Sequence, residues 1–128
     1  MERDHQAALC RWARTQESNI PELKLLYAVF NGAHLAGGKL SGWRAKQEGL
    51  RPGVPDLCLP VPRGRYHSLY IEMKDESPNA RTSNEQKAWH AALRDQGHAV
   101  AVCHGWLAAK AMIERYFALD SVKLQEAA

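Results

Sequence analysis

The spacing of apolar residues predicts three helices. Residues 2–14 carry apolar side chains that recur on one helical face, and residues 106–117 form a second apolar stretch of helical length. Between them, Ser83 and Gln86 have the spacing of a capping box and open a helix that Gly97 closes. The inward stripe of this helix is expected to consist of Glu85, Ala88, Trp89, Ala92, Leu93 and Gln96.

Four shorter apolar runs predict strands. Residues 54–59 and 66–74 flank a turn at Gly64, which is typical of a β-hairpin. Residues 98–103 are short and partly β-branched, which favours a strand. Residues 25–30 end at a turn signal and are interpreted as a strand, although six residues are also compatible with a short buried helix. The order helix, strand, strand, strand, helix, strand, helix predicts an α/β fold, a three-layer sandwich in which helices flank a mixed central sheet.

Two acids and a lysine are expected to share one face of the predicted hairpin. Glu72 and Lys74 alternate with apolar residues, so both point to the same face with backbones about 7 Å apart. If the hairpin is centred on Gly64, facing residue numbers sum to 128, and Asp56 lies opposite Glu72. A register shift of one residue would instead turn Asp56 to the other face.

These residues resemble the core motif of a nuclease superfamily. A Pro-Asp pair, a spacer of fifteen residues and then Glu-x-Lys resemble the PD-(D/E)XK nucleases. The glycine before this motif and the Ser-x-x-Gln after it more closely resemble the virus-type replication-repair nuclease domain, VRR-NUC. The resemblance covers about residues 2–117 and implies the restriction-endonuclease-like form of the sandwich. The residues that carry it are Gly53, Pro55, Asp56, Glu72, Lys74, Ser83 and Gln86.

Oxygen ligands at these positions suit a divalent cation. The Cβ atoms of Asp56 and Glu72 would lie roughly 4.5–5.5 Å apart. Carboxylates without thiolate or imidazole favour Mg²⁺, for which Mn²⁺ can substitute. The resemblance adds the backbone carbonyl of Met73 and an acid from the first helix, Glu2, as further metal ligands. From spacing alone, Glu2 is a solvated acid that the dipole at the start of the helix favours.

Two other polar side chains are candidates for catalysis. Lys74, next to the metal, could orient the attacking water or stabilise charge at phosphorus, whereas action as a base requires it to lose a proton first. Capping alone accounts for Gln86, but the resemblance places its equivalent beside the metal, where it could orient a phosphate or a water. No histidine is assigned a catalytic role. His90, one turn after Gln86, is expected to be a packing or surface residue at most bordering the site.

Basic residues before and after the carboxylates are candidates to bind DNA. Four of them fall within thirteen residues, and a further arginine ends the polar loop at 75–81. A solvated loop is the ordinary interpretation of such charges. Beside a phosphodiester-cleaving centre they could instead guide phosphates. These candidates are Lys39, Arg44, Lys46, Arg51 and Arg81.

The bulk properties are those of one soluble domain. The chain of 128 residues is expected to fold as a single nuclease domain with a core at about 2–117 and a polar tail at 118–128. A net charge of +3 is compatible with a polyanionic partner. Three scattered cysteines fit a reducing compartment. With neither a signal peptide nor a membrane-spanning run, no membrane partner and a cytoplasmic location are expected.

The leading functional hypothesis is a Mg²⁺-dependent DNA endonuclease. The resemblance implies selectivity for branched DNA, such as four-way (Holliday) junctions, and action as a homodimer, because two symmetric cuts need two sites. One alternative is a non-catalytic DNA-binding accessory module of the same fold, and another is a nuclease of flaps or linear duplex. The third is a structural α/β domain whose acids form a surface salt bridge with Lys74.

Overall fold

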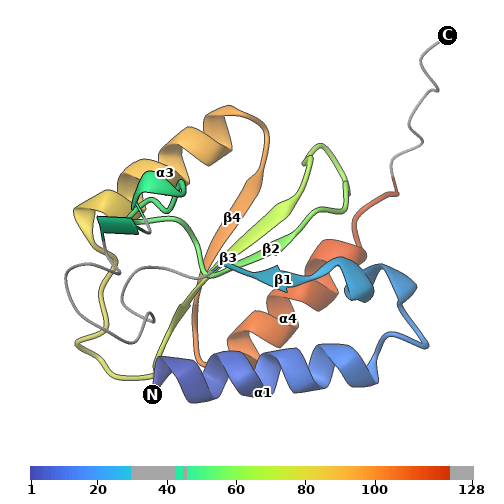
Figure 1. Ribbon diagram of the computed structural model, residues 1–128. Helices are drawn as coiled ribbons and strands as arrows, with labels where there is room; N and C mark the ends of the chain where they lie inside the picture. Colours follow the sequence, from blue (N-terminus) through green and yellow to red (C-terminus); the bar gives the residue numbers. More distant parts are fainter. Residues whose placement is uncertain (30–42, 45, 122–128) are drawn as a thin grey trace, which may run out of the picture.

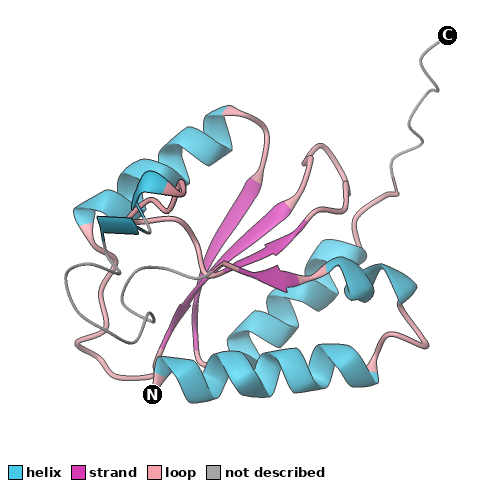
Figure 2. Cartoon of the chain, in the orientation of Figure 1, coloured by secondary structure: helices cyan, strands magenta, loops and turns pink. Residues whose placement is uncertain are grey.

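A mixed four-stranded sheet forms the centre of the computed structural model, which describes residues 1–29, 43–44 and 46–121. Its strands, in spatial order, are β1 (Tyr27–Ala28), β2 (Leu57–Leu59), β3 (Leu69–Lys74) and β4 (Ala99–His104). The helices are α1 (Glu2–Thr15), the 3₁₀ helix η1 (Pro21–Leu25), α3 (Asn84–Asp95) and α4 (Trp106–Phe117). Figure 1 and Figure 2 show these elements, which confirm the α/β class and the mixed sheet. None of the described helices is long and apolar enough to cross a bilayer.

Helices cover both faces of the sheet. Alternate side chains of β2 and β3, including Leu57 and Ile71, pack with α1 and α4 in one apolar core. Helix α3 lies across the other face, so three layers are seen in Figure 1. Burial of each large apolar side chain contributes roughly 1.5–3 kcal/mol. The fully buried apolar residues of this core include Leu9, Leu23, Leu57, Leu59, Leu69, Ile71, Met73, Ile113 and Tyr116.

The hairpin register expected from Gly64 is confirmed. Leu57 pairs with Ile71, and each pair of facing residues sums to 128. Both strands are shorter than the predicted ranges 54–59 and 66–74. Prolines directly after β2 remove the N–H donors that a longer ladder would need. The side chains of both strands therefore keep the expected faces, although the regular part of the hairpin is short.

The predicted strand at 25–30 is confirmed only over the two residues of β1. Pro21 starts η1, whose last residue falls within the predicted run. The chain then pairs antiparallel with β2, and the N–H of Val29 continues the contact by donating to the carbonyl of Asp56 at 2.8 Å. The last residue of the predicted run lies outside the described residues.

Helix α3 is rotated relative to the expected stripe: Trp89 and Leu93 do face inward, but Glu85, Ala88, Ala92 and Gln96 are exposed, so the prediction was wrong for these four. Its alanines were placed inward because they are apolar, but Ala88 and Ala92 are exposed. The sheet beneath the helix presents Glu72 and Lys74, so polar side chains of the helix face inward to meet them. The positions that are partly or fully buried are Gln86, Trp89, His90 and Leu93.

Candidate active site

Asp56 lies where the ladder of the hairpin stops. Its carboxylate Oδ2 accepts a hydrogen bond from the backbone N–H of Met73 at 2.7 Å. The pairing of β2 with β3 ends at Leu57 and Ile71, so no backbone carbonyl of β2 faces the N–H of Met73. The side chain of Asp56 supplies the missing acceptor. The hydrogen bond fixes the carboxylate directly beside β3.

Gly53 allows the segment before Asp56 to pass close to α3. Its φ is +92°, and a Cβ atom would lie 2.7 Å from the carbonyl carbon and oxygen of Glu85 and 3.0 Å from Cδ1 of Trp89. Contacts this short exclude any other residue without a shift of the helix, and the positive φ adds strain for a side chain. Glycine therefore sets the distance between the Asp56 segment and the helix that covers the site.

Glu72 is a buried acid with incomplete hydrogen bonding. It is 1% exposed, and its Oε1 has no hydrogen-bond partner among the described residues. Burial, hydrogen bonding with Asp56 and the charge of Asp56 raise the pKa of Glu72 to about 9, although Lys74 acts in the opposite direction. The structure thus brings together the two carboxylates that the hairpin register paired, and the raised pKa favours a protonated Glu72 in the protein alone.

His90 borders this site, as its spacing from Gln86 allowed, although the sequence favoured a packing or surface residue. Its Nε2 lies 3.5 Å from Oε1 of Glu72, and neither atom has a hydrogen-bond partner in the described part of the chain. Burial, followed by the charges of Arg94 and Lys74, lowers the pKa of His90 and favours a neutral imidazole. The available signal was its spacing from Gln86, because residues four apart share one helix face.

Lys74 and Gln86 are in direct contact. Lys74 is 7% exposed, and its Nζ donates to Oε1 of Gln86 at 3.1 Å. The same oxygen accepts from the backbone N–H of Ser83 at 2.8 Å, and the N–H of Gln86 donates back to the Ser83 hydroxyl at 3.1 Å. The capping box is therefore present, and its glutamine also holds the lysine ammonium.

Met73 and Glu2 approach the carboxylates in different ways. The N–H of Met73 points toward the β2 side of β3, and the alternation of strand backbone groups directs its carbonyl to that same side, beyond the last ladder pair. Glu2 is exposed in the first turn of α1, and its charge is one of the causes that raise the pKa of Glu72. Met73 thus offers an oxygen beside Asp56, while Glu2 acts on the site through its charge.

The donor set suits a cation that keeps part of its water shell. Within residues 1–29, 43–44 and 46–121, no group of three or more His, Cys, Asp or Glu side chains is arranged to hold a metal. Asp56 and Glu72 nevertheless present neighbouring carboxylates, one with a buried, unpaired oxygen. Mg²⁺ commonly binds through one or two carboxylates and several waters, whereas a structural zinc site needs four protein ligands. The residues present therefore fit Mg²⁺ or Mn²⁺.

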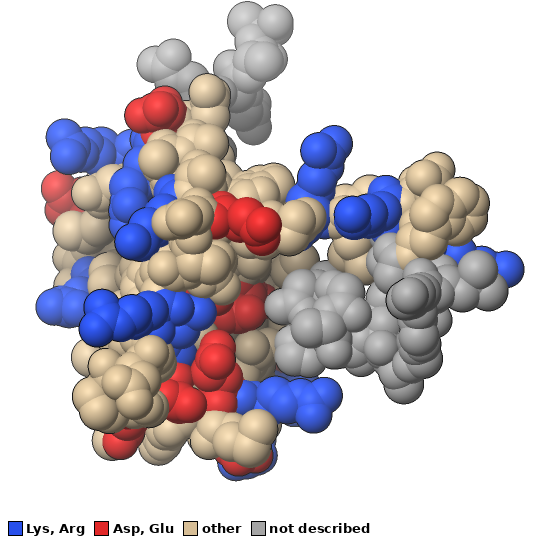
Figure 3. Space-filling model, turned by 90° about the vertical axis from the view of Figure 1, so that its left-hand side faces the viewer, with Lys and Arg blue, Asp and Glu red and all other residues tan. Residues whose placement is uncertain are grey.

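Most of the predicted DNA-binding residues are exposed. Arg44 and Lys46 lie on a short helical segment, and Arg51 and Arg81 lie on loops. Lys39 lies outside the described residues. Figure 3 shows acidic side chains gathered in the middle of one face of the molecule with Lys and Arg side chains around them. A negatively charged centre with a basic surround is an arrangement that could hold a cation against a polyanion.

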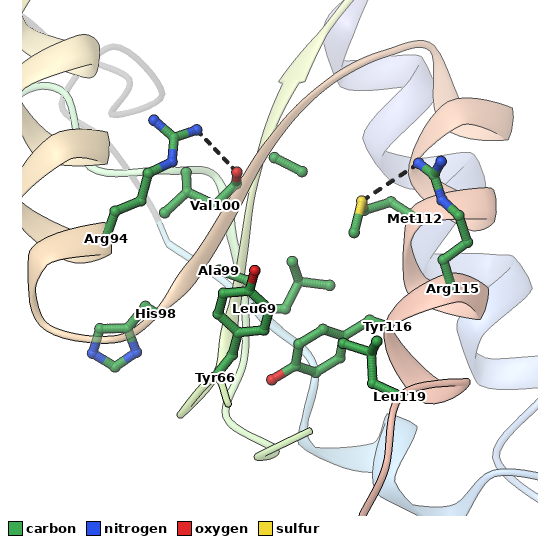
Figure 4. A pocket seen from close by; sticks show the side chains of 11 residues that line it. Tyr66, Leu69, Arg94, His98, Ala99, Val100, Met112, Arg115, Tyr116 and Leu119 are labelled. Atoms are coloured by element: carbon green, nitrogen blue, oxygen red, sulfur yellow. Dashed lines mark hydrogen bonds between the residues drawn. The ribbon is translucent and has the colours of Figure 1, made fainter. Parts of the chain in front are cut away.

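A cavity of about 360 Å³ lies at the other end of the sheet, between β4 and α4. Its lining is largely apolar, with Arg94 and Arg115 on opposite sides (Figure 4). Arg94 donates to the carbonyl of Val100 at 3.0 Å, and Arg115 contacts the sulfur of Met112 at 3.6 Å. None of the predicted site residues lines this cavity, so the candidate chemistry lies elsewhere.

Comparison with known proteins agrees with this geometry. The sequence profile of the VRR-NUC domain matches residues 2–106, which is most of the chain. A solved structure described as a VRR_NUC domain protein has a TM-score of 0.78 and 24% sequence identity, with 96% of this chain and 93% of that chain covered. No curated protein matches the sequence. The chain therefore belongs to the VRR-NUC domain family.

Proposed function

We propose that this protein is a divalent-metal-dependent DNA endonuclease of the PD-(D/E)XK type. The observation that carries the proposal is the carboxylate pair of Asp56 and Glu72 beside a buried Lys74. A glutamate pKa of about 9 is the kind of perturbation that clusters at functional sites. Membership in the VRR-NUC family suggests a nuclease-type role in DNA processing and so supports the same reading.

The metal would be held by oxygen atoms of this chain. Asp56 and Glu72 would bind it directly, with the Met73 carbonyl as a further ligand, and the exposed side chain of Glu2 would have to turn inward to add another. When bound, Mg²⁺ or Mn²⁺ would supply charge neutralisation and a nucleophilic hydroxide for phosphodiester hydrolysis. The positive charge of the metal would favour the ionised form of Glu72 and so replace the proton that this carboxyl holds in its absence.

Lys74 would place a fixed positive charge beside the scissile phosphate. The 3.1 Å hydrogen bond to Gln86 holds the ammonium at the start of α3. From there it would stabilise the negative charge that grows at phosphorus and orient the attacking water. Gln86 would act as a positioning residue through the same oxygen that caps α3.

Phosphates on either side of the cut would be bound by the exposed basic residues. We assign this role to Arg44, Lys46, Arg51 and Arg81, with Lys39 added from its place in the sequence. The substrate that we propose is branched DNA, including four-way junctions. A homodimer would cut it, since two symmetric incisions require two sites.

A cleavage assay on defined DNA structures tests this function. Purified protein is incubated with an end-labelled four-way junction, a flap and a linear duplex, each with Mg²⁺, with Mn²⁺ or with a chelator. We expect cleavage of the junction only when a cation is present. Sequence-dependent cuts in linear duplex without junction cleavage would overturn the substrate assignment. Tight binding of all three without cleavage would favour a non-catalytic accessory module.

The assignment of residues has its own test. Asp56→Asn, Glu72→Gln and Lys74→Ala are each expected to lower the cleavage rate by about 100-fold or more, because each removes charge from the reacting centre. DNA binding and folding should be largely kept. Glu114→Gln is a matched control, since Glu114 is an exposed acid on α4. A normal cleavage rate in any of the three variants would contradict its role.

A further inference from the structure

A row of side chains crosses the carboxylate face of the sheet one step from Glu72. The strand pairing places Tyr27 opposite Cys58 and Cys58 opposite Tyr70. Tyr70 and Glu72 are two residues apart on β3, so they share a face with backbones about 7 Å apart. The row therefore runs beside the carboxylates and ends at the edge strand β1.

The two tyrosines of this row flank a buried thiol. Cys58 is 2% exposed, whereas Tyr27 is 51% exposed and Tyr70 is half-buried. Hydrogen bonding with Cys58, followed by burial and the neighbouring Cys58 and Tyr70 groups, raises the pKa of Tyr27 to about 12. Tyr27 and Tyr70 therefore stand on either side of Cys58, across three neighbouring strands. Half of the surface of Tyr27 is exposed to solvent, so this ring is not fully packed in the core and can contact a ligand.

The ring of Tyr70 is held in place from the β4 side. It meets the ring of His98 edge to face, with centroids 5.4 Å apart and an interplanar angle of 89°. Nδ1 of His98 lies 2.6 Å from the hydroxyl of Ser68, which fixes the imidazole in turn. An open ring on β1 and a fixed ring on β3 therefore lie in one line beside the candidate active site.

We infer that Tyr27 and Tyr70 form a stacking platform for the base of an unpaired nucleotide next to the scissile phosphate. The inference rests on the proposed function, because it needs DNA at the carboxylates. A base inside a duplex has both faces covered by its neighbours, so only an unstacked base can use such a platform. The substrate class is accordingly DNA with an unpaired nucleotide beside the cut, as at a branch point or a flap.

Fluorescence of a base analogue tests the platform without any cleavage. A four-way junction with one extra, unpaired 2-aminopurine nucleotide inserted at its branch and a flap with 2-aminopurine as its first unpaired nucleotide are the probes, and wild-type protein is added in chelator. Stacking on an aromatic ring should quench the fluorescence. Tyr27→Phe keeps the ring and should quench equally. Tyr27→Leu should abolish the quenching and weaken binding of the unpaired DNA roughly 10-fold, with binding of linear duplex unchanged.

Each outcome separates the platform from the nuclease activity. Quenching by Tyr27→Leu equal to wild type would overturn the platform even if the protein cleaves DNA. Equal loss of affinity for linear duplex would also overturn it, because Tyr27 would then be a general DNA contact. If Tyr27→Leu loses the quenching that wild type shows, but wild type itself does not cleave DNA, the platform would be supported and the proposed nuclease activity refuted. Thermal melting of Tyr27→Leu shows that the fold is kept, and Tyr27→Trp, which restores a ring, should restore quenching.

Discussion

The buried polar groups at the two ends of β3 differ in whether they have hydrogen-bond partners. Directly before its first residue, the hydroxyl of Ser68 and Nδ1 of His98 are 2.6 Å apart and satisfy each other. At its far end, Oε1 of Glu72 and Nε2 of His90 are buried 3.5 Å apart, and neither has a hydrogen-bond partner among the described residues. The same strand thus carries a completed polar contact at one end and an incomplete one at the other.

The cavity and the unpaired buried polar atoms therefore lie at different ends of β3. The cavity of Figure 4 lies at the satisfied end, where Arg94 already caps the carbonyl of Val100. An unpaired buried polar group costs about 1–3 kcal/mol, and native proteins keep few of them. The unsatisfied pair of Glu72 and His90 is therefore a better guide to a functional site than the size of a cavity.

The largest expected effect is a pH dependence that arises at the unsatisfied end. The folded-state pKa of Glu72, about 9, lies above the ordinary value of 4.5. Folded protein therefore keeps a proton that unfolded protein releases between these values. The stability from this proton is fully present below about pH 4.5 and is lost as pH rises through 9. Without metal, wild type should lose on the order of a few kcal/mol of unfolding free energy between pH 5 and 9.

Urea denaturation in chelator at a series of pH values measures this loss. Glu72→Gln cannot titrate at this position, so its unfolding free energy should change less with pH. If the unfolding free energies of the two proteins change with pH in parallel, the pKa of Glu72 is not raised. The contrast between the two ends of β3 would then not hold.

A smaller effect is expected from adding a cation. Mg²⁺ that binds the folded site should raise the unfolding free energy by about 2.7 kcal/mol when its concentration is 100 times its Kd. Thermal melting with and without Mg²⁺ measures the change. Asp56→Asn should remove most of the increase, whereas Glu114→Gln should keep it. An equal increase in Asp56→Asn would place the cation somewhere other than the carboxylates.

The smallest effect is expected at the satisfied end. The hydroxyl of Tyr116 donates to the carbonyl of Val61 at 2.6 Å in the buried core. Tyr116→Phe leaves that carbonyl unpaired and should lower the unfolding free energy by about 1–2 kcal/mol, as measured by urea denaturation. The stabilisation by Mg²⁺ should be the same as in wild type. A selective loss of that stabilisation would mean that the two ends are coupled.

The sequence was informative where a local rule decides the structure. The register of the β2–β3 ladder agrees with the two-residue repeat counted from Gly64 and was predicted correctly, although the tip of the hairpin pairs Arg63 with Tyr66. The rotation of α3 follows instead from the polar surface it meets, which only the assembled sheet provides. A stripe chosen by hydrophobicity therefore put the alanines inside, and it left His90 out of the inward face.

The roles of individual side chains were harder to separate. The capping box at Ser83 and Gln86 was predicted from spacing, and it is present. Spacing alone gave no reason for the same glutamine to contact Lys74, because that contact joins residues twelve apart on different elements. Glu2 was ambiguous for a related reason, since only the docking of α1 brings its charge within reach of Glu72.

The shared oxygen of Gln86 ties the integrity of one helical turn to the placement of one ammonium group. When the first turn of α3 opens, Oε1 leaves the N–H of Ser83 and Nζ of Lys74 together. The packed layer between the sheet, α1 and α4 lies on the opposite face and needs no part of that turn. A molecule can therefore keep a native interior and yet lose the orientation of its lysine.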